Sequence, residues 1–155
     1  MKKKILRIIL IAVITLFIIG VSIAGFAYFG LRGIPESHIE GNVPDESVFN
    51  QYFLRDLTTY FKQKVGKEVS VRYELLRDGP SQSGLAYPKY YAWVTVVSLS
   101  DNSVIQLGAV YIAAINKEYF QVDDFISKKE IEENPDTLNQ IFPLDVIVKI
   151  KQKIN

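Results

Sequence analysis

The chain has 155 residues, with 18 Lys and Arg, 17 Asp and Glu, one histidine and no cysteine. Without cysteine it forms no disulfide and carries no thiolate chemistry. Four of the 18 basic residues stand in the first seven positions, which leaves 14 basic against 17 acidic residues, about −3, so the remainder lacks the basic surface that a nucleic-acid partner requires.

An uncharged run from Ile8 to Leu31 follows three lysines and Arg7. As a helix, at about 1.5 Å per residue, this run crosses a hydrocarbon core of about 30 Å with some tilt. The sequence therefore predicts a basic stub at residues 1–7 and a transmembrane signal anchor at residues 8–31. A lipid bilayer is accordingly the first expected partner.

The basic residues before the anchor set its orientation. The positive-inside bias predicts a single-pass protein of the cell membrane, with a cytoplasmic N-terminus and an extracytoplasmic C-terminal domain. A cleaved signal peptide is the alternative, and Ser22-Ile23-Ala24 is a passable cleavage site. The apolar run is longer than the 7–15 residues usual for a signal peptide, which favours the uncleaved anchor. The lack of cysteine is more typical of a bacterial envelope protein than of a small secreted eukaryotic domain.

A linker rich in Pro and Gly, residues 32–44, separates the anchor from a domain at residues 45–155. The domain should begin with a helix that is capped by Asp45 or Ser47, runs to about Val65 and ends at Gly66. Large aromatic residues recur at helical spacing on one stripe of this helix, and we interpret them as core: Phe49, Phe53, Tyr60 and Phe61.

Three strands are expected after this helix. Residues Val69–Leu76 alternate between apolar and polar side chains, which predicts a strand with one solvated face. Two longer strands, Tyr90–Leu99 and Val104–Ile115, should form a hairpin through a two-residue turn, with Trp93 opposite Val110. Both faces of this hairpin are apolar, so it should lie in the middle of the sheet. Gly108 suggests a bulge or a bend there.

A short strand, Tyr119–Val122, and small helices complete the domain. Ser127 and Glu130 form a capping-box pattern, and the last helix carries an apolar stripe from Val146 to Ile154. The expected fold is α+β: an N-terminal transmembrane helix, then one long helix packed on a curved antiparallel sheet of three or four strands, then short C-terminal helices. This order resembles a reduced cystatin-like or NTF2-like domain, a likeness of architecture that implies no function.

No pattern for catalysis, cofactors or metals is present. His38 is the only histidine, so the usual zinc sites cannot be assembled. Ser81 and Ser83 lack the Gly-x-Ser-x-Gly turn of a hydrolase, and no phosphate-binding glycine motif occurs. The carboxylates at Asp123-Asp124 and Glu130–Glu133 are interpreted as solvated. We therefore expect a non-enzymatic protein without a cofactor or a metal.

The segment Arg77–Lys89 is longer than an ordinary hairpin link and contains several turn-forming residues. It also holds apolar side chains that a solvated loop would not need, and the predicted partner-binding residues are Leu85, Tyr87 and Tyr90. The alternative is that this segment folds back over the core of its own sheet.

Two functional hypotheses follow. The first is a membrane-anchored, non-enzymatic domain that binds another envelope protein or itself. The second is a small-molecule or lipid-binding domain with an apolar cavity between the helix and the sheet. A closed aromatic core favours the first hypothesis and an open apolar pocket the second, whereas convergent buried carboxylates would indicate an enzyme.

Overall fold

The computed structural model describes residues 15, 19–21, 41–82 and 86–154. The chain divides into two units, Met1–Pro35 and Glu36–Asn155. The predicted anchor, Ile8–Leu31, lies outside the described residues except at Thr15 and residues 19–21, which are helical and exposed. Within the described ranges, no helix combines the length and the apolar character needed to cross a membrane.

The domain begins with a long helix, α3, at Glu46–Val65. Asp45 is the N-cap residue, and its carbonyl oxygen accepts hydrogen bonds from the backbone N–H groups of Val48 and Phe49 at 3.0 and 2.9 Å. Gly66 ends the helix with a φ of 70°, a left-handed conformation that glycine adopts without strain. The helix predicted from the sequence is confirmed at both ends.

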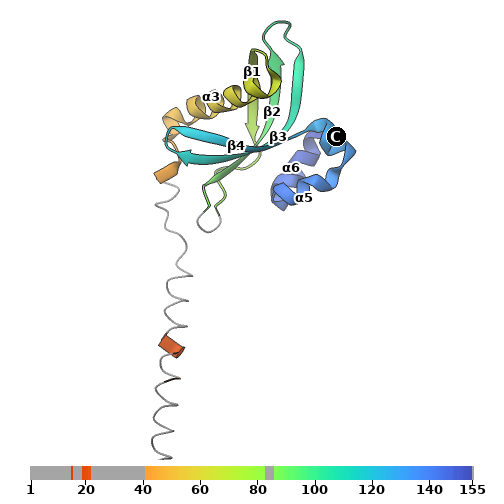
Figure 1. Ribbon diagram of the computed structural model, residues 1–155. Coiled ribbons are helices and arrows are strands. Elements are labelled where there is room, and N and C mark those ends of the chain that lie inside the picture. The colour runs from red at the N-terminus through yellow and green to blue at the C-terminus, as the bar shows by residue number, and fades with distance from the viewer. Residues whose placement is uncertain (1–14, 16–18, 22–40, 83–85, 155) are drawn as a thin grey trace, which may run out of the picture. The chain divides into compact units, whose positions relative to one another are not determined.

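A four-stranded antiparallel sheet follows α3, in the spatial order β1-β2-β3-β4 (Figure 1). Short helices come after the last strand, so the α+β fold with one long helix is confirmed. The strands are β1 at Val69–Leu75, β2 at Lys89–Ser98, β3 at Val104–Asn116 and β4 at Tyr119–Ser127; the helices are α4 at Lys128–Glu133, a 3-10 turn at Pro135–Thr137, α5 at Leu138–Ile141 and α6 at Leu144–Ile154.

The predicted hairpin register was wrong by one residue. Trp93 stands opposite Ala109 and not Val110. A shift of one residue moves every side chain of one strand to the other face of the sheet. Ala109 therefore shares the face of Trp93, whereas Val110 packs on the opposite face, against α3.

The turn between β2 and β3 explains this error. Residues 99–103 connect the strands. The Ser98 N–H donates to the Ser103 carbonyl at 2.9 Å and closes a four-residue loop in place of a two-residue turn. Asn102 has a φ of 57°, and Asp101 accepts from the Ser103 N–H at 3.1 Å. A β-bulge near Val96 then shifts the register once more.

The fourth strand extends past the predicted end at Val122, to Ser127. A β-bulge is the reason: Tyr111 pairs with Asp124 and Ile112 with Val122, so Asp123 is the extra residue on β4. The bulge interrupts the alternation that marks a strand in sequence. The two adjacent carboxylates, Asp123 and Asp124, therefore led to a predicted strand end that was too early.

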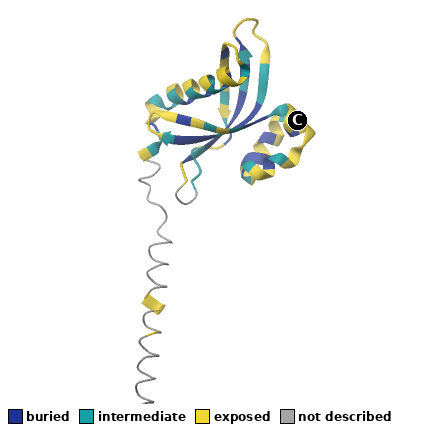
Figure 2. Cartoon of the chain, viewed as in Figure 1, coloured by how far each residue is buried: buried dark blue, intermediate teal, exposed yellow. Residues whose placement is uncertain are grey.

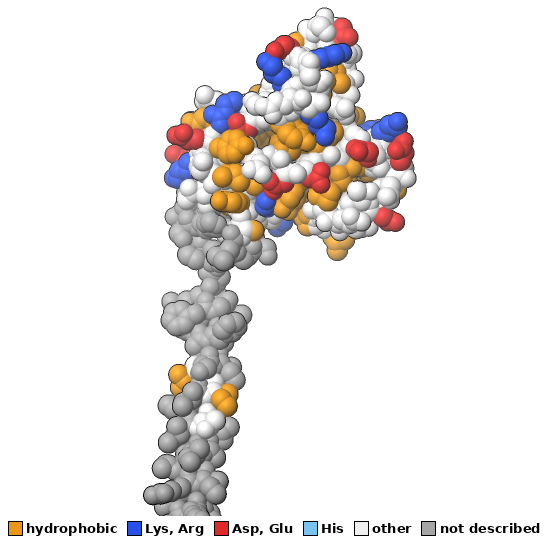
Figure 3. All heavy atoms as spheres, in the orientation of Figure 1, with side chains coloured by type: hydrophobic (Ala, Val, Ile, Leu, Met, Phe, Trp, Pro, Cys, Tyr) orange, Lys and Arg blue, Asp and Glu red, His pale blue; other side chains and the backbone are white. Residues whose placement is uncertain are grey.

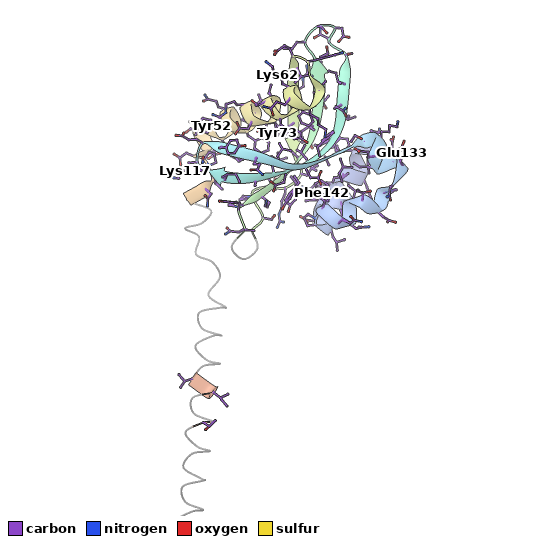
Figure 4. All side chains as sticks on the ribbon, viewed as in Figure 1. Tyr52, Lys62, Tyr73, Lys117, Glu133 and Phe142 are labelled. Atoms are coloured by element: carbon purple, nitrogen blue, oxygen red, sulfur yellow. The ribbon has the colours of Figure 1, made fainter. Side chains whose placement is uncertain are left out.

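Helix α3 covers one face of the sheet and the C-terminal helices cover the other, and a separate hydrophobic core lies under each (Figure 2). The core under α3 is rich in aromatic rings, and Phe53 and Phe61 are fully buried in it. The core under the C-terminal helices contains Trp93, which is 7% exposed, and Phe142, which lies among these helices (Figure 4). Predicting the β2–β3 hairpin in the middle of the sheet was correct.

Gly108 lies where β4 leaves the sheet, opposite Val94 on one side and Ser127 on the other. A Cβ atom at this position would overlap the Ile126 carbonyl oxygen and lie 2.8 Å from the Cα of Ser127. These are backbone atoms, which cannot turn aside as a flexible side chain can. Glycine is therefore required at this position by close approach. The bulge suggested at Gly108 is not found there, because the register shifts of both ladders fall at other residues.

We expect Gly108→Ala to reduce the free energy of unfolding by about 3 kcal/mol, because the added methyl group overpacks the β3–β4 contact. Chemical denaturation, followed by the fluorescence of the single tryptophan, measures this loss. Gly41→Ala is the matched control, since a Cβ at Gly41 meets nothing within 4 Å. Equal stability of the two variants would contradict the role assigned to Gly108.

Candidate functional site

The loop between β1 and β2, residues 76–88, is held at its base by backbone hydrogen bonds. Ser81 and Lys89 exchange two N–H to carbonyl bonds, at 2.8 and 2.7 Å, outside the regular ladder. The Pro88 carbonyl accepts from the Ala114 N–H at 2.8 Å, and this ties the loop to β3 as well. The described base of the loop is thus fixed to two strands.

The three predicted partner-binding residues have different positions. Tyr87 is 44% exposed on the loop, whereas Leu85 lies outside the described residues. Tyr90 is 4% exposed, and its ring centroid is 5.0 Å from that of Phe49 in the core under α3. The alternative interpretation, in which the loop covers the core, applies to Pro88, which is buried. Of the described residues among the three, only Tyr87 is exposed.

A cluster of polar and aromatic side chains lies on the sheet at the base of this loop. We call Ser81, Lys89, Tyr91, Tyr111 and Asp123 the tyrosine–lysine cluster. The Tyr91 and Tyr111 rings stack with centroids 5.6 Å apart, and the Tyr91 hydroxyl lies 2.9 Å from the Ser81 Oγ. The Lys89 ammonium lies 4.6 Å from the centre of the Tyr111 ring and forms an ion pair with Asp123. The cluster joins the loop to β2, β3 and β4.

The charge state of Lys89 limits what the cluster can do. Partial burial of the ammonium lowers the pKa of Lys89, but hydrogen bonds to Asp123 and Tyr111 outweigh this effect and leave the pKa above its ordinary value. A lysine that acts as a general base needs a lowered pKa. Lys89 is therefore protonated at neutral pH, where it positions Tyr111 and Asp123.

Glu130, from the acidic group after β4, is likewise held by local hydrogen bonds. Glu130 accepts from the Ser127 side chain and backbone in a capping box, and these hydrogen bonds lower the pKa of its carboxyl group. A surface hollow of about 330 Å³ beside Glu130 is lined by both polar and apolar groups, from β4 to α5. Acidic and basic side chains are interspersed over the visible face of the domain (Figure 3). Across the described ranges, no three His, Cys, Asp or Glu side chains are grouped to hold a metal ion.

The tyrosine–lysine cluster was missed from the sequence. Asp123 was interpreted as solvated, yet its side chain is 22% exposed and paired with Lys89 from two strands away. In the observed register Lys89 stands opposite Ala113, and Ala113 stands opposite Gln121. Asp123 follows Gln121 by two residues on β4, which brings it within reach of Lys89. His38 and Ser83, which the sequence raised as candidates for chemistry, lie outside the described residues.

No family model, curated protein or solved structure matches this chain. Its function is therefore argued from its own residues.

The burial of Tyr90 has a consequence at high pH. Burial raises the pKa of Tyr90 from 10.0 to about 12. Above pH 10 the unfolded chain releases this proton while the folded chain keeps it, so stability falls as the pH rises from 10 towards 12. We expect Tyr90→Phe to flatten that fall in denaturation curves measured across this range. An unchanged slope would contradict the burial of the hydroxyl group.

Proposed function

We propose that the chain is a membrane-anchored, non-enzymatic protein-interaction domain of a bacterial cell envelope. The uncharged run Ile8–Leu31 and the lysines before it support the anchor and its orientation, with the domain outside the cytoplasm. The order of one helix and four antiparallel strands supports a likeness to cystatin-like domains, which carries no functional assignment.

The observation that carries the interaction role is an exposed aromatic side chain on a loop with a fixed base. Tyr87 is 44% exposed, and the backbone bonds of Ser81 and Lys89 restrict the segment from which it rises. A tyrosine ring buries a large area on binding, and a fixed base lowers the entropy that binding must overcome. The tyrosine–lysine cluster stiffens the same base.

Packing between α3 and the sheet favours this role over the ligand-binding alternative. The rings in this layer lie with centroids 4.6–6.0 Å apart, which is the spacing of direct contact. The hollow at the margin of the layer, beside Tyr60 and Phe120, has a volume of about 170 Å³. Ligand pockets usually measure about 300–1,000 Å³. A lipid or a small molecule would have to displace the rings.

Topology is tested with reporters fused after Asn155 in bacterial cells. We expect a reporter that is active only outside the cytoplasm to work, and one that is active only inside to remain silent, because of the lysines before the anchor. Sequencing of the mature N-terminus checks retention of the anchor. The reverse reporter pattern would overturn the orientation, and a mature chain beginning at Gly25 would overturn the anchor.

The loop is tested with Tyr87→Ser, alone and together with Leu85→Ser. We expect the thermal midpoint to change little, because Tyr87 is largely outside the core, while in-cell crosslinks to the partner disappear. Tyr119→Ser is the matched control, since Tyr119 is also 44% exposed but lies on β4. A large fall in the midpoint with intact crosslinks would assign the loop to the core and sink the proposed interface.

A further inference from the structure

The last helix, α6, carries apolar side chains on two sides. Val146, Ile147 and Ile150 are buried in the core under the C-terminal helices, on the face of the sheet opposite α3 (Figure 1). Leu144 and Val148 are four residues apart, so they are neighbours on the outer side, and they are 79% and 57% exposed. Since the core side of α6 is already filled, any surface that covers this outer pair comes from outside the described domain.

Two lysines border the outer pair. Lys151 follows Val148 by three residues and lies along the same face of the helix, whereas Lys149 lies on the other side of Val148. Both lysines are exposed, and neither has an ion pair with any residue that the structure describes. The outer face of α6 therefore combines exposed aliphatic side chains with positive charges that the domain leaves unneutralised.

The other two charged residues of α6 are neutralised within the domain. Lys153 forms an ion pair with Glu74 on β1. Asp145, the one acidic residue of the helix, lies 3.8 Å from the guanidinium of Arg77. The positive charge that remains on α6 is thus that of the two lysines beside the apolar pair.

Charge is divided unequally between α6 and the rest of the domain. The helix contains three lysines and one aspartate, whereas residues 45–143 contain ten basic and 14 acidic residues. A negatively charged surface therefore attracts α6 and repels the remainder of the domain as a whole. This asymmetry would turn the outer face of α6 towards such a surface.

We infer that the outer face of α6 docks on an anionic lipid bilayer, with Leu144 and Val148 in the headgroup region and Lys149 and Lys151 beside lipid phosphates. Aliphatic side chains bordered by lysines are typical of helices that lie in a membrane interface. A protein partner fits this face less well, because its apolar area is small and α6 has none of the aromatic or arginine residues that usually anchor protein interfaces.

The contact is weak by itself, since two aliphatic side chains enter the bilayer to a shallow depth. The inference therefore rests on the proposed anchor, which would hold the domain beside the same membrane and raise the local concentration of lipid. The predicted linker, residues 32–44, spans at most about 45 Å when fully extended. An anchored domain would thus remain close enough to the bilayer for weak docking to be populated.

The test uses the full chain, reconstituted from detergent into vesicles, with a polarity-sensitive fluorophore on a single cysteine. The natural chain has no cysteine, so only the introduced thiol is labelled. Gln152→Cys places the label one turn after Val148, and Gln51→Cys, exposed on α3, is the matched control. We expect the emission of the Gln152→Cys label to shift to shorter wavelength in vesicles with one-third phosphatidylglycerol, but not in phosphatidylcholine alone. The control label should not shift in either.

The two kinds of side chain are tested separately in the Gln152→Cys background. Lys149→Gln together with Lys151→Gln should lower the ratio of docked to undocked helix about 30-fold, because each lysine near an anionic surface contributes to binding. Leu144→Ser together with Val148→Ser should abolish the shift. Val104→Ser, at a position that is 61% exposed on β3, is the control and should leave the shift unchanged. The emission of buried Trp93 confirms that each variant is folded.

Three results overturn the inference: no shift at Gln152→Cys in anionic vesicles, an equal shift in neutral vesicles, or an equal shift at Gln51→Cys. A crosslink in cells from Gln152→Cys to another protein, with no shift on vesicles, would assign the face to a protein partner and overturn the inference as well.

Flotation of the same vesicles separates the anchor from the docking. A chain that floats with neutral vesicles but shows no shift in anionic ones overturns the docking and leaves the anchor standing. A chain that floats only with anionic vesicles, and shows the shift there, supports the docking and overturns the anchor.

Discussion

The fully buried ring of Phe53 contacts rings from the helix and from both edge strands. Its centroid lies 5.2 Å from that of Phe49 on α3, 4.6 Å from Tyr73 on β1 and 5.1 Å from Phe120 on β4. Because β1 and β4 are not neighbours, a single side chain can touch both only if the sheet curves around the helix. The curvature, and with it the shape of both faces, depends on this contact.

Curvature decides where the polar groups of the opposite face meet. The bulge at Asp123 accommodates the bend of β4, and it leaves a carboxylate where Lys89 can reach it from β2. The ion pair then spans β3, with the Lys89 ammonium over the ring of Tyr111. The C-terminal helices cover the rest of this face, with Trp93 beneath them. The tyrosine–lysine cluster is therefore a consequence of the same bend that the aromatic layer produces.

Local patterns predicted the elements, and long-range pairing limited the rest. Asp45, Gly66 and the Ser127–Glu130 box each act within a few residues, so the ends of α3 and the start of α4 could be read from the sequence. The register of β2 and β3 depends on a turn that is two residues longer than predicted and on a bulge. The alternation of apolar and polar residues in the sequence reveals neither feature. The predicted end of the fourth strand at Val122 left Asp123 outside the sheet and hid the Lys89–Asp123 pair. The burial of Tyr90 was missed for a different reason, since a strand pattern with two apolar faces does not say which residues lie beneath α3.

Two covered faces leave loops and edges as the surfaces with which the sheet can bind. The Tyr87 loop precedes Lys89 at the start of β2, whereas the β2–β3 turn follows Ser98 at its end. The strand has 10 residues, and at about 3.3 Å per residue this places the two surfaces about 30 Å apart. Contacts separated by that distance and sharing no side chain should act independently.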